Sequence, residues 1–571
     1  MNDEKQKILA IIYFTLIILS LIIYNNRENL YIRPEAYFYI LSIAASLIFL
    51  QIITCRNFDK FIIAIIFLEI ALLPISFLAT QQALFKTVLS RDPWFHWILV
   101  EEIVRRGHIP LYEEIPIPYV KMPNFHILIA FGMILTGVPY KWSQFLFVGL
   151  PTLLILTSTA FLLYNKIFGL KVAILSVLFV AIADNVLDMC GRNIVPNSIG
   201  VAIALTVFYL CCFKNFFDLR IKITAILISF SLVLTHTVSF SFLLYQIAVL
   251  TAISFLFRNP QSVSYLNFAV LLIVFAVFEW ALYSGLYFGS LITMIKQLFV
   301  YGFDIERYES RLPTSFLDAV IARSGMILYT VFAGFFALIL FIKSLKNKDE
   351  KLLVNTLSTG GILAGASSFL TPAMAGISHR FWYYGEVLGS GFIGNIISYM
   401  EKSRKEKIKP ILKILSVVFL FMLALLMFKA NVAADDNPII PHYSQRTGWT
   451  DSELEAGKFI VIRQGNVPLS SDFDYSNNLN FLKTNLLASG VLEKVERVYP
   501  RTLEELYEFD CIFVFRKDMF ENRLFYLGGR WSQTPQIPLK EDTKTVIYSL
   551  NVRGSNVYNN GNVLMFFLSK A

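Results

Sequence analysis

Long apolar runs recur through the first 430 residues of the chain. A helix needs about 20 mostly apolar residues to cross a hydrocarbon core of about 30 Å, and roughly 13 runs of this kind are present. Hydrophobic residues make up 56% of the 571 residues and charged residues only 16%, which excludes a water-soluble fold over this length. We therefore predict a polytopic α-helical membrane protein, with spans at residues 7–24, 36–54, 60–80, 143–164, 168–184, 194–213, 221–236, 240–257, 265–290, 321–342, 352–371, 381–400 and 409–429.

The apolar run at 124–138 is the exception, because about 15 residues are too few to cross a bilayer. We expect it to lie at the interface or to re-enter the membrane. The basic residues of seven loops then fall on one side, which the positive-inside rule places in the cytoplasm. The net charge of +9 is thus a sign of topology and not of nucleic-acid binding. The cations concerned are Lys5, Lys7, Arg56, Lys60, Lys166, Lys171, Lys214, Arg220, Lys222, Arg258, Lys343, Lys346, Lys348, Lys351, Lys402, Arg404, Lys405, Lys407 and Lys409.

This topology predicts a multi-pass protein of the cell membrane with a cytoplasmic N-terminus. The external face collects the segments 81–123, 184–196, the turn near His236 with loop 291–320, and 372–381. Residues 1–430 are expected to form the transmembrane domain and residues 431–571 a soluble extracytoplasmic α/β domain. In that domain, strands are predicted at 458–463, 511–517, 545–550 and 562–568, and helices near 475–498 and at 502–509.

The stretch Ser90–Pro110, "SRDPWFHWILVEEIVRRGHIP", places many ionisable groups beside the membrane. Its aromatic and aliphatic residues alternate with polar ones, as in a helix that lies along the interface. Glu101 with Arg105 and Glu102 with Arg106 have the (i, i+4) spacing of ordinary surface ion pairs. Asp92 and His96 precede this section among aromatic residues, and each is a candidate for a catalytic role or for a helix cap.

Several short motifs resemble the membrane glycosyltransferases of the GT-C superfamily. They are "DPWFH" at 92–96, "GHIP" at 107–110, "PNFH" at 123–126, "YNKIFGLK" at 164–171 and "SHRFWYYGEVLG" at 378–389. The catalytic subunits of archaeal oligosaccharyltransferases carry a similar Asp-Pro-Trp-aromatic-His run in the same external loop. The resemblance implies a GT-C-like fold and transfer of a sugar from a polyprenyl phosphate or pyrophosphate to an external acceptor.

The same resemblance assigns roles to individual residues. Asp92 would be the carboxylate of the first loop, acting as a base or as a metal ligand near the acceptor. Arg380 would bind the donor phosphate, flanked by His379 and Tyr383, because a guanidinium offers paired contacts to a phosphate that gains charge as it leaves. The alternative for Arg380 is an interfacial arginine that extends toward water.

The chain departs from the oligosaccharyltransferases at two places. The second external segment reads "CGRNIVPNSIG" at 190–200, without the acidic pair that helps those enzymes to hold a divalent metal. Asp184 and Asp188 lie slightly earlier and are candidate ligands, with Asp92, for Mg²⁺ or Mn²⁺; the alternative is that both are helix-end acids. The Trp-Trp-Asp-Tyr-Gly motif of their soluble domain is also missing, which puts recognition of a peptide sequon in doubt.

Six further residues near the external face are candidates for the phosphate site or the substrate cavity. Arg192 begins a span before Pro196, where free backbone N–H groups favour an anion, and a cap or topology marker is the alternative. Glu279 is the only acid of its apolar run, which marks it as a functional candidate; the alternative is a neutral or hydrogen-bonded Glu. The remaining candidates, for which ordinary turn, loop or interface roles are the alternatives, are His126, His236, Arg307 and Arg311.

Two classes of function remain open. The first is a GT-C-type glycosyltransferase (EC 2.4 class) that uses a polyprenyl-linked sugar donor and an external protein, glycan or lipid acceptor. The second is a transporter or flippase for a lipid-linked or anionic solute, for which paired repeats and charged groups at mid-membrane are expected. We find no repeated halves, and the polar candidates gather at one face, which favours chemistry there. An enzyme-like scaffold without activity is a third reading.

Overall fold

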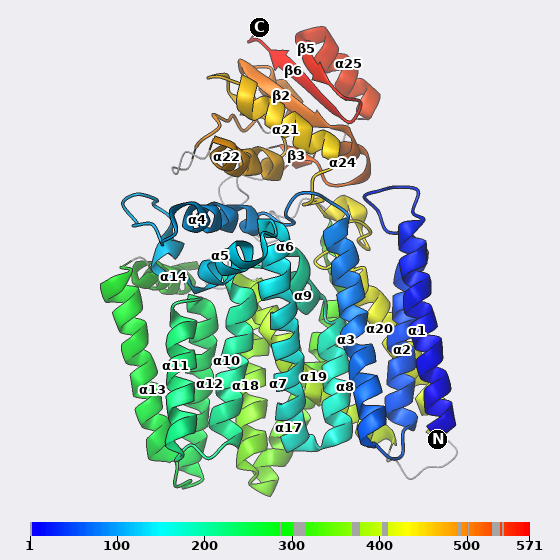
Figure 1. The fold of residues 1–571 in the computed structure, drawn as a ribbon, viewed down its shortest axis with the longest axis vertical. Coiled ribbons are helices and arrows are strands. Elements are labelled where there is room, and N and C mark those ends of the chain that lie inside the picture. Colours follow the sequence, from blue (N-terminus) through cyan, green and yellow to red (C-terminus); the bar gives the residue numbers. More distant parts are fainter. Residues whose placement is uncertain are drawn as a thin grey trace.

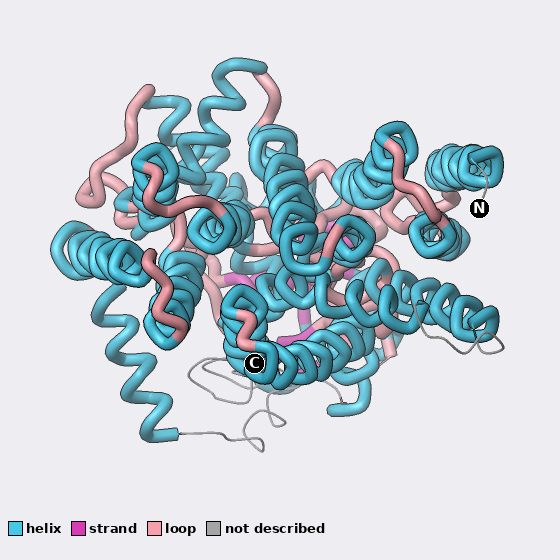
Figure 2. Tube along the Cα trace, turned by 90° about the horizontal axis from the view of Figure 1, so that it is seen from below, coloured by secondary structure: helices cyan, strands magenta, loops and turns pink. Residues whose placement is uncertain are grey.

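The computed structural model describes residues 3–285, 287–301, 315–367, 377–401, 409–487, 493–500, 502–527, 537–538 and 542–570. A bundle of long helices forms the larger part, and a smaller domain of strands and helices sits on one of its ends (Figure 1). Viewed from the opposite end, many of the long helices are seen end on, so they run nearly parallel (Figure 2). This arrangement confirms the predicted fold class, a polytopic helical membrane protein with a C-terminal α/β domain.

Each predicted span corresponds to a helix or a continuous helical segment. Among the described residues, nine helices are long and apolar enough to cross a membrane, or up to ten if the pair bent by 59° at Ala183 counts as one span. Helices α11 and α18 have only 15 and 17 residues, but they stand beside the others in the bundle (Figure 1). The segments are α1 Asp3–Asn25, α2 Glu35–Thr54, α3 Lys60–Ala83, α6–η2–α7 Tyr140–Phe168, α8 Leu170–Ile182 with α9–η3 Asp184–Arg192, α10 Pro196–Phe213, α11 Leu219–Val233, α12 Thr237–Leu256, α13–η4 Ser262–Tyr283, α17 Ser324–Asn347, α18 Glu350–Ala366, α19 Ser378–Glu401 and α20 Lys409–Phe428.

A layer of short elements lies across the end of the bundle that faces the C-terminal domain (Figure 1). It contains α4 (Asp92–Arg106), η1 (Pro118–Lys121), α5 (Asn124–Thr136) and α14 (Tyr287–Tyr301); α16 (Phe316–Ala322) leads into α17. Helix α5 has 13 residues, and α6–η2–α7 begins at the same end of the bundle at which α3 finishes. The run at 124–138 therefore does not cross, as predicted.

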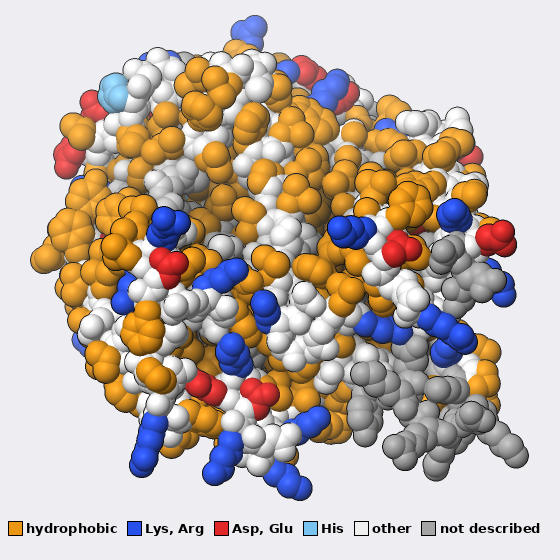
Figure 3. Space-filling model, turned by 60° about the horizontal axis from the view of Figure 1, so that its bottom comes forward, with side chains coloured by type: hydrophobic (Ala, Val, Ile, Leu, Met, Phe, Trp, Pro, Cys, Tyr) orange, Lys and Arg blue, Asp and Glu red, His pale blue; other side chains and the backbone are white. Residues whose placement is uncertain are grey.

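The basic loops share the end of the bundle that is remote from the C-terminal domain. The N-terminus and the turns after α2, α7, α10, α12 and α17 all lie there (Figure 1). Lysine and arginine side chains gather on this face (Figure 3). The cluster between 402 and 408 falls outside the described residues. The division of charge between the two ends of the bundle is the one that the loop sequences predicted.

The C-terminal domain is built on a four-stranded sheet of order β1-β2-β6-β5, in which only the β1–β2 pair is parallel. Strands β3 and β4 form a separate antiparallel pair. Its elements are η7 Pro441–Tyr443, α21 Asp451–Arg463, β1 Leu469–Ser470, α22 Phe473–Leu487, α23 Leu503–Leu506, β2 Cys511–Arg516, α24 Lys517–Asn522, β3 Tyr526–Leu527, β4 Ile537–Pro538, α25 Thr543–Arg553, β5 Gly554–Asn559 and β6 Val563–Leu568.

Two of the four predicted strands in this domain are wrong. Residues 458–463 and 545–550 belong to helices α21 and α25, whereas 511–516 and 563–568 are strands as predicted. The cause is local capping. The Thr450 and Glu453 side chains form a capping box at the start of α21, and Asp542 accepts hydrogen bonds from two backbone N–H groups at the start of α25. The predicted helix near 475–498 is also shorter, since α22 ends at Leu487.

Aromatic and ionic contacts seat the C-terminal domain on the bundle. The Trp449 ring lies 4.9 Å from that of Trp94 on α4 and 4.4 Å from that of Tyr475 on α22. The Arg33 guanidinium forms an ion pair of 2.7 Å with Asp436, and both side chains are fully buried. Because the Trp94–Trp449 and Arg33–Asp436 contacts join segments more than 350 residues apart, they fix the domain on the bundle.

Candidate active site

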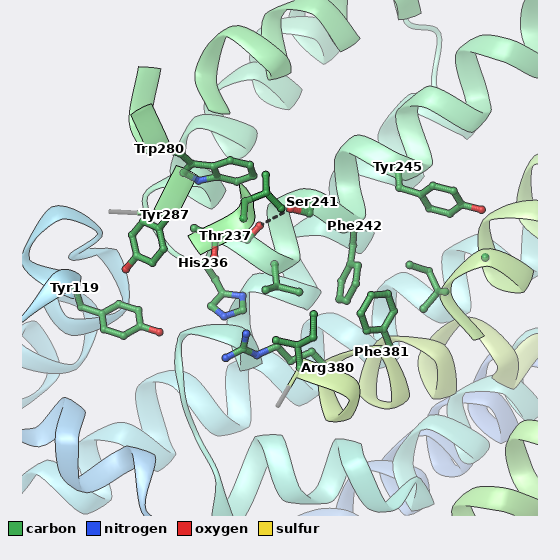
Figure 4. A pocket seen from close by; sticks show the side chains of 15 residues that line it. Tyr119, His236, Thr237, Ser241, Phe242, Tyr245, Trp280, Tyr287, Arg380 and Phe381 are labelled. Carbon is green, nitrogen blue, oxygen red and sulfur yellow. Dashed lines mark hydrogen bonds between the residues drawn. The ribbon is translucent and has the colours of Figure 1, made fainter. Parts of the chain in front are cut away.

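A cavity of about 560 Å³ opens at the end of the bundle that faces the C-terminal domain. Residues of η1, α12, η4, α14, α18 and α19 line it, and they divide into a polar and an apolar end (Figure 4). The polar end contains Tyr119, His236, Trp280, Tyr287 and Arg380, and the apolar end contains Phe242, Tyr245, Ile362 and Phe381. The cavity is thus suited to a molecule with a polar head and a hydrophobic tail.

Arg380 is the charged group of the polar end. It lies in the first turn of α19, and its guanidinium points into the same space as the Tyr119 hydroxyl and the His236 ring (Figure 4). It forms no ion pair with any described residue, and its buried Nε has no hydrogen-bond partner among them. This partly buried guanidinium has no counter-charge among the described residues, so the arrangement favours an anionic ligand.

Tyr119 connects Arg380 with Asp92 electrostatically. Burial raises the pKa of the Tyr119 hydroxyl, the Arg380 guanidinium lowers it, and the Asp92 carboxylate raises it. The two charges predicted to act together, those of Arg380 and Asp92, thus both influence the Tyr119 hydroxyl. Asp92 itself does not line the cavity described above; it is the first residue of α4, and its side chain is 53% exposed.

His236 lies in the wall of the cavity and also begins a helix. Its Nδ1 accepts a hydrogen bond of 3.2 Å from the Ser239 backbone N–H at the start of α12, and lies 2.9 Å from the Ser239 hydroxyl. Burial, followed by the charge of Arg380, holds the pKa of His236 well below its ordinary value. The residue is neutral at pH 7. It is both a hydrogen-bonded residue of the turn before α12 and a residue of the cavity wall, the two alternatives that the sequence left open.

His96 and His126 lie next to Tyr119, whose side chain lines the cavity. Their rings share a hydrogen bond of 3.0 Å between His96 Nδ1 and His126 Nε2, and both side chains are buried. The Tyr119 ring lies 4.7 Å from that of His96. Burial lowers the pKa of His96 to about 4, although Asp92 opposes the shift, so His96 is uncharged at neutral pH. Neither histidine lines the cavity.

The ion pairs predicted on α4 form only in part. Glu102 pairs with Arg106 at 2.8 Å, as predicted, and also with Arg105. Glu101 instead accepts a hydrogen bond of 2.8 Å from the Trp97 indole N–H. The charged residues at 101–106 thus have partners within α4 itself. Asp92 is not among them, and the charged group beside it is Arg91, whose Nε lies 3.8 Å away.

The acids proposed as metal ligands have other partners. Asp184 accepts hydrogen bonds from the Asn185 backbone and side chain, and the same amide group binds Glu386 at 2.8 Å. Asp188 accepts a bond of 2.9 Å from Arg192. In the described ranges, no group of three or more His, Cys, Asp or Glu side chains is placed to hold a metal ion. These residues do not fit the predicted Mg²⁺ or Mn²⁺ site.

Arg192 and Tyr383, predicted at the phosphate, are engaged elsewhere. Arg192 binds Asp188 and lies 3.6 Å from Asp435 of the C-terminal segment, and the Tyr383 hydroxyl donates to the Ser198 carbonyl at 3.0 Å. His379 is half-buried beside Arg380 and does not line the cavity. For Tyr383 and His379 the reason is the direction of their side chains on α19, and for Arg192 it is the pairing with Asp188 and Asp435; a motif in the sequence gives neither.

The remaining candidates divide between the cavity and the undescribed segment. Glu279 is 1% exposed in the π-helical turn η4, next to the cavity residue Trp280. Arg307 and Arg311 lie outside the described residues. Sequence reasoning missed Tyr119, Trp280 and Tyr287. The signals were a Pro directly before Tyr119 and Glu279 directly before Trp280, whereas Tyr287 stands between Leu286 and Phe288 and has no such neighbour.

Solved structures with the same overall fold include an archaeal oligosaccharyltransferase. The Archaeoglobus fulgidus enzyme in complex with Zn and sulfate matches with a TM-score of 0.50 and 10% identity, over 90% of this chain and 78% of that one. The same enzyme, named AglB, in complex with an inhibitory peptide and a dolichol-phosphate matches with a TM-score of 0.50 and 10% identity, over 94% and 75% of the two chains.

Comparisons of the sequence with family models and with curated proteins find no match. At 10% identity, the structural likeness shows the fold and leaves the activity to be argued from the site. The GT-C resemblance drawn from the short motifs is thus confirmed at the level of the fold.

Proposed function

We propose that the protein is a glycosyltransferase that moves a sugar from a polyprenyl phosphate or pyrophosphate to an acceptor at the outer face of the cell membrane. The observation that carries the proposal is Arg380, which forms no ion pair with a described residue, at the polar end of a cavity whose other end is apolar. A polyprenyl-linked donor is divided in the same way, into a phosphate and an isoprenoid chain. The AglB structure that shares this fold was solved with a dolichol-phosphate.

The orientation of the protein follows from its loops. The basic turns lie at the end remote from the C-terminal domain (Figure 3), and positive loops are retained in the cytoplasm. The N-terminus is then cytoplasmic, and the cavity, α4 and the C-terminal domain lie on the extracytoplasmic side. The donor's isoprenoid chain would occupy the apolar end, where Phe242 and Phe381 pack with their ring centroids 4.9 Å apart.

The chemistry requires two charged groups with opposite tasks. The acceptor's nucleophilic atom attacks the anomeric carbon, the bond from that carbon to the phosphate oxygen breaks, and the oxygen keeps the electron pair. The Arg380 guanidinium is suited to stabilise the charge that develops on this leaving phosphate. Asp92, whose charge also acts on Tyr119, is suited to take the proton that the acceptor loses. Attack from the side opposite to the phosphate would invert the anomeric carbon.

The test is sugar transfer in membranes that contain the protein and its natural acceptor, supplied with radiolabelled polyprenyl-phospho-sugars. Arg380→Ala is expected to lower the transfer rate by roughly 100- to 1000-fold, since it removes a contact to the developing charge. Asp92→Ala is expected to lower it by at least about 100-fold. Arg27→Ala is a matched control, because Arg27 lies at the same end of the bundle beside α1 and binds only local carbonyls.

Full transfer by both variants would disprove the site, whatever their expression level. Passage of an intact lipid-linked sugar across sealed vesicles, without transfer, would support a flippase in place of the enzyme.

A further inference from the structure

Unsatisfied hydrogen-bond donors gather at the polar end of the cavity. Three side chains of its wall carry a buried atom that can donate but has no hydrogen-bond partner among the described residues. These atoms are the Arg380 Nε, the Trp280 indole nitrogen and the Tyr287 hydroxyl. Buried polar atoms in native proteins nearly always have a partner, so three in one wall require an explanation. They come from α19, η4 and α14, and a ligand between these elements would satisfy all three.

His236 adds a fourth donor to the same wall. Its Nδ1 accepts the Ser239 backbone N–H, and the low pKa of the ring, caused first by burial, keeps it neutral, so its one proton is on Nε2. Figure 4 shows the His236 ring and the Arg380 guanidinium in one space, toward which the Tyr119 hydroxyl points. Imidazole Nε2–H and indole N–H groups donate and do not accept, so the ligand must supply acceptors.

The charge of this wall is as informative as its donors. Among the described residues that line the cavity, Arg380 is the one that is charged at neutral pH, and no Asp or Glu is present. Lys121, two residues after Tyr119, does not line the cavity, and its Nζ lies 5.0 Å from the Tyr283 ring centroid. The described wall therefore offers one positive charge and several neutral donors.

A phosphodiester matches this set of groups. It carries one negative charge, shared by two non-bridging oxygens, and a guanidinium can bind both oxygens side by side. The remaining lone pairs of these oxygens are open to the neutral donors. A pyrophosphate that joins a lipid to a sugar carries two negative charges, and the second would be desolvated without a balancing cation in the described wall. Because an unbalanced buried charge is costly, the phosphodiester is the better fit.

We infer that the donor substrate is a polyprenyl monophospho-sugar and not a polyprenyl pyrophospho-sugar, with its phosphodiester held by Arg380 and by the neutral donors of His236, Trp280 and Tyr287. This inference rests on the proposed function, which leaves both kinds of donor open, and it selects one of them. It also makes Trp280 and Tyr287 phosphate-binding residues, while the isoprenoid chain occupies the apolar end of the cavity.

The test compares two lipids that differ only in the number of phosphates. Dolichyl methyl phosphate carries one negative charge and dolichyl methyl pyrophosphate carries two, and the methyl group replaces the sugar so that no sugar preference enters. Dissociation constants are measured for the whole protein in nanodiscs, once with EDTA and once with MgCl₂. The wild type is expected to bind the monophosphate at least about tenfold more tightly than the pyrophosphate under both conditions.

Removal of single donors tests the named residues. Trp280→Phe and Tyr287→Phe are each expected to weaken binding of the monophosphate by about tenfold, because each loses one hydrogen bond to a charged group. Tyr283→Phe is the matched control and should change neither dissociation constant, since Tyr283 is 50% exposed and does not line the cavity. Without lipid, Tyr287→Phe should unfold at the wild-type temperature, because its hydroxyl has no partner in the described part of the chain.

A second positive charge in the wall should change the preference. Leu291 lines the cavity one turn after Tyr287 on α14 and is half-buried, so a lysine there can extend along the wall. Leu291→Lys is expected to reduce the preference for the monophosphate by about fivefold, since the added ammonium balances the second phosphate charge. Leu291→Met, which adds no charge, is expected to leave the preference unchanged.

The outcomes separate this inference from the proposed function. Equal affinity for the two lipids, or tighter binding of the pyrophosphate under either condition, would overturn the inference. If Arg380→Ala then abolished binding of both lipids, the phosphate site would still stand. Wild-type affinity for the monophosphate in both Trp280→Phe and Tyr287→Phe would contradict the inference as well. If the wild type binds neither lipid, the proposed function is wrong, and the inference with it.

Discussion

The two polar regions at the outer end of the bundle differ in how their charges are satisfied. At the junction with the C-terminal domain, Arg33 binds Asp436, and Arg192 binds Asp188 beside Asp435. At the cavity, Arg380 forms no ion pair and the Glu279 carboxyl no hydrogen bond with any residue that the structure describes. Charge pairing inside the first region makes it a structural joint. The second region is what we expect of a binding site, because a ligand can supply the missing partners.

The largest expected effect breaks the joint. Asp436→Ala leaves the fully buried Arg33 without its counter-ion and removes three hydrogen bonds, so it should lower the free energy of unfolding by about 3–5 kcal/mol. Thermal unfolding in detergent, followed by tryptophan fluorescence, measures the change. Lys86→Ala is the control, because the Lys86–Asp451 pair is exposed to solvent and should contribute little to stability. Equal losses in the two variants would contradict the distinction.

The comparison of two arginines is next in size. Arg192→Ala should lower the free energy of unfolding by about 2–3 kcal/mol, since it leaves Asp188 buried and unpaired. Arg380→Ala should leave stability unchanged or raise it, and should abolish the stabilisation that saturating dolichyl phosphate gives to the wild type. Both are read from unfolding temperatures with and without the lipid. If Arg380→Ala strongly destabilised the protein, the role of this arginine would be structural, and the contrast with Arg192 would be wrong.

The smallest expected effect is a pH dependence at the joint. Burial raises the pKa of Asp474 on α22 to about 6. The charges of Arg91 and Arg516 lower this pKa, and those of Asp472 and Asp92 raise it. The folded protein therefore holds this proton more tightly than the unfolded chain does, and stability falls as pH rises from about 4 to 6. The half-buried carboxyl should contribute roughly 1 kcal/mol after screening by solvent. Asp474→Asn should flatten this part of the stability profile, and an unchanged slope would exclude Asp474 as its source.

The membrane topology was predictable because its signals are local. Each apolar run became a helix, and the short run at 124–138 became α5, which does not cross. The two misassigned strands in the C-terminal domain show the limit of hydrophobic patterns. An alternating run such as 458–463 is compatible with either structure, and here the capping box of Thr450 and Glu453 decides for a helix.

The candidate site was predictable only in part. The sequence singled out Asp92, Arg380, His236 and Glu279, which the structure brings to one end of the bundle, with His236 and Arg380 in the cavity wall. It also proposed Arg192 for the phosphate, because a basic residue before a helix start has the same local pattern whether or not it is paired. Its partner Asp435 lies more than 200 residues later, and no local pattern reports that contact.

The sequence by itself determined that the chain crosses a membrane many times, and which loops share a side, because hydropathy and loop charge act within a single segment. Tertiary structure alone decided which buried charges are neutralised. Tyr119, His236, Tyr287 and Arg380 come from four separate segments, and whether a guanidinium there meets a carboxylate or an open cavity depends on packing between helices. That packing distinguishes Arg192, which pairs with Asp188 and Asp435, from Arg380, which forms no ion pair with a described residue.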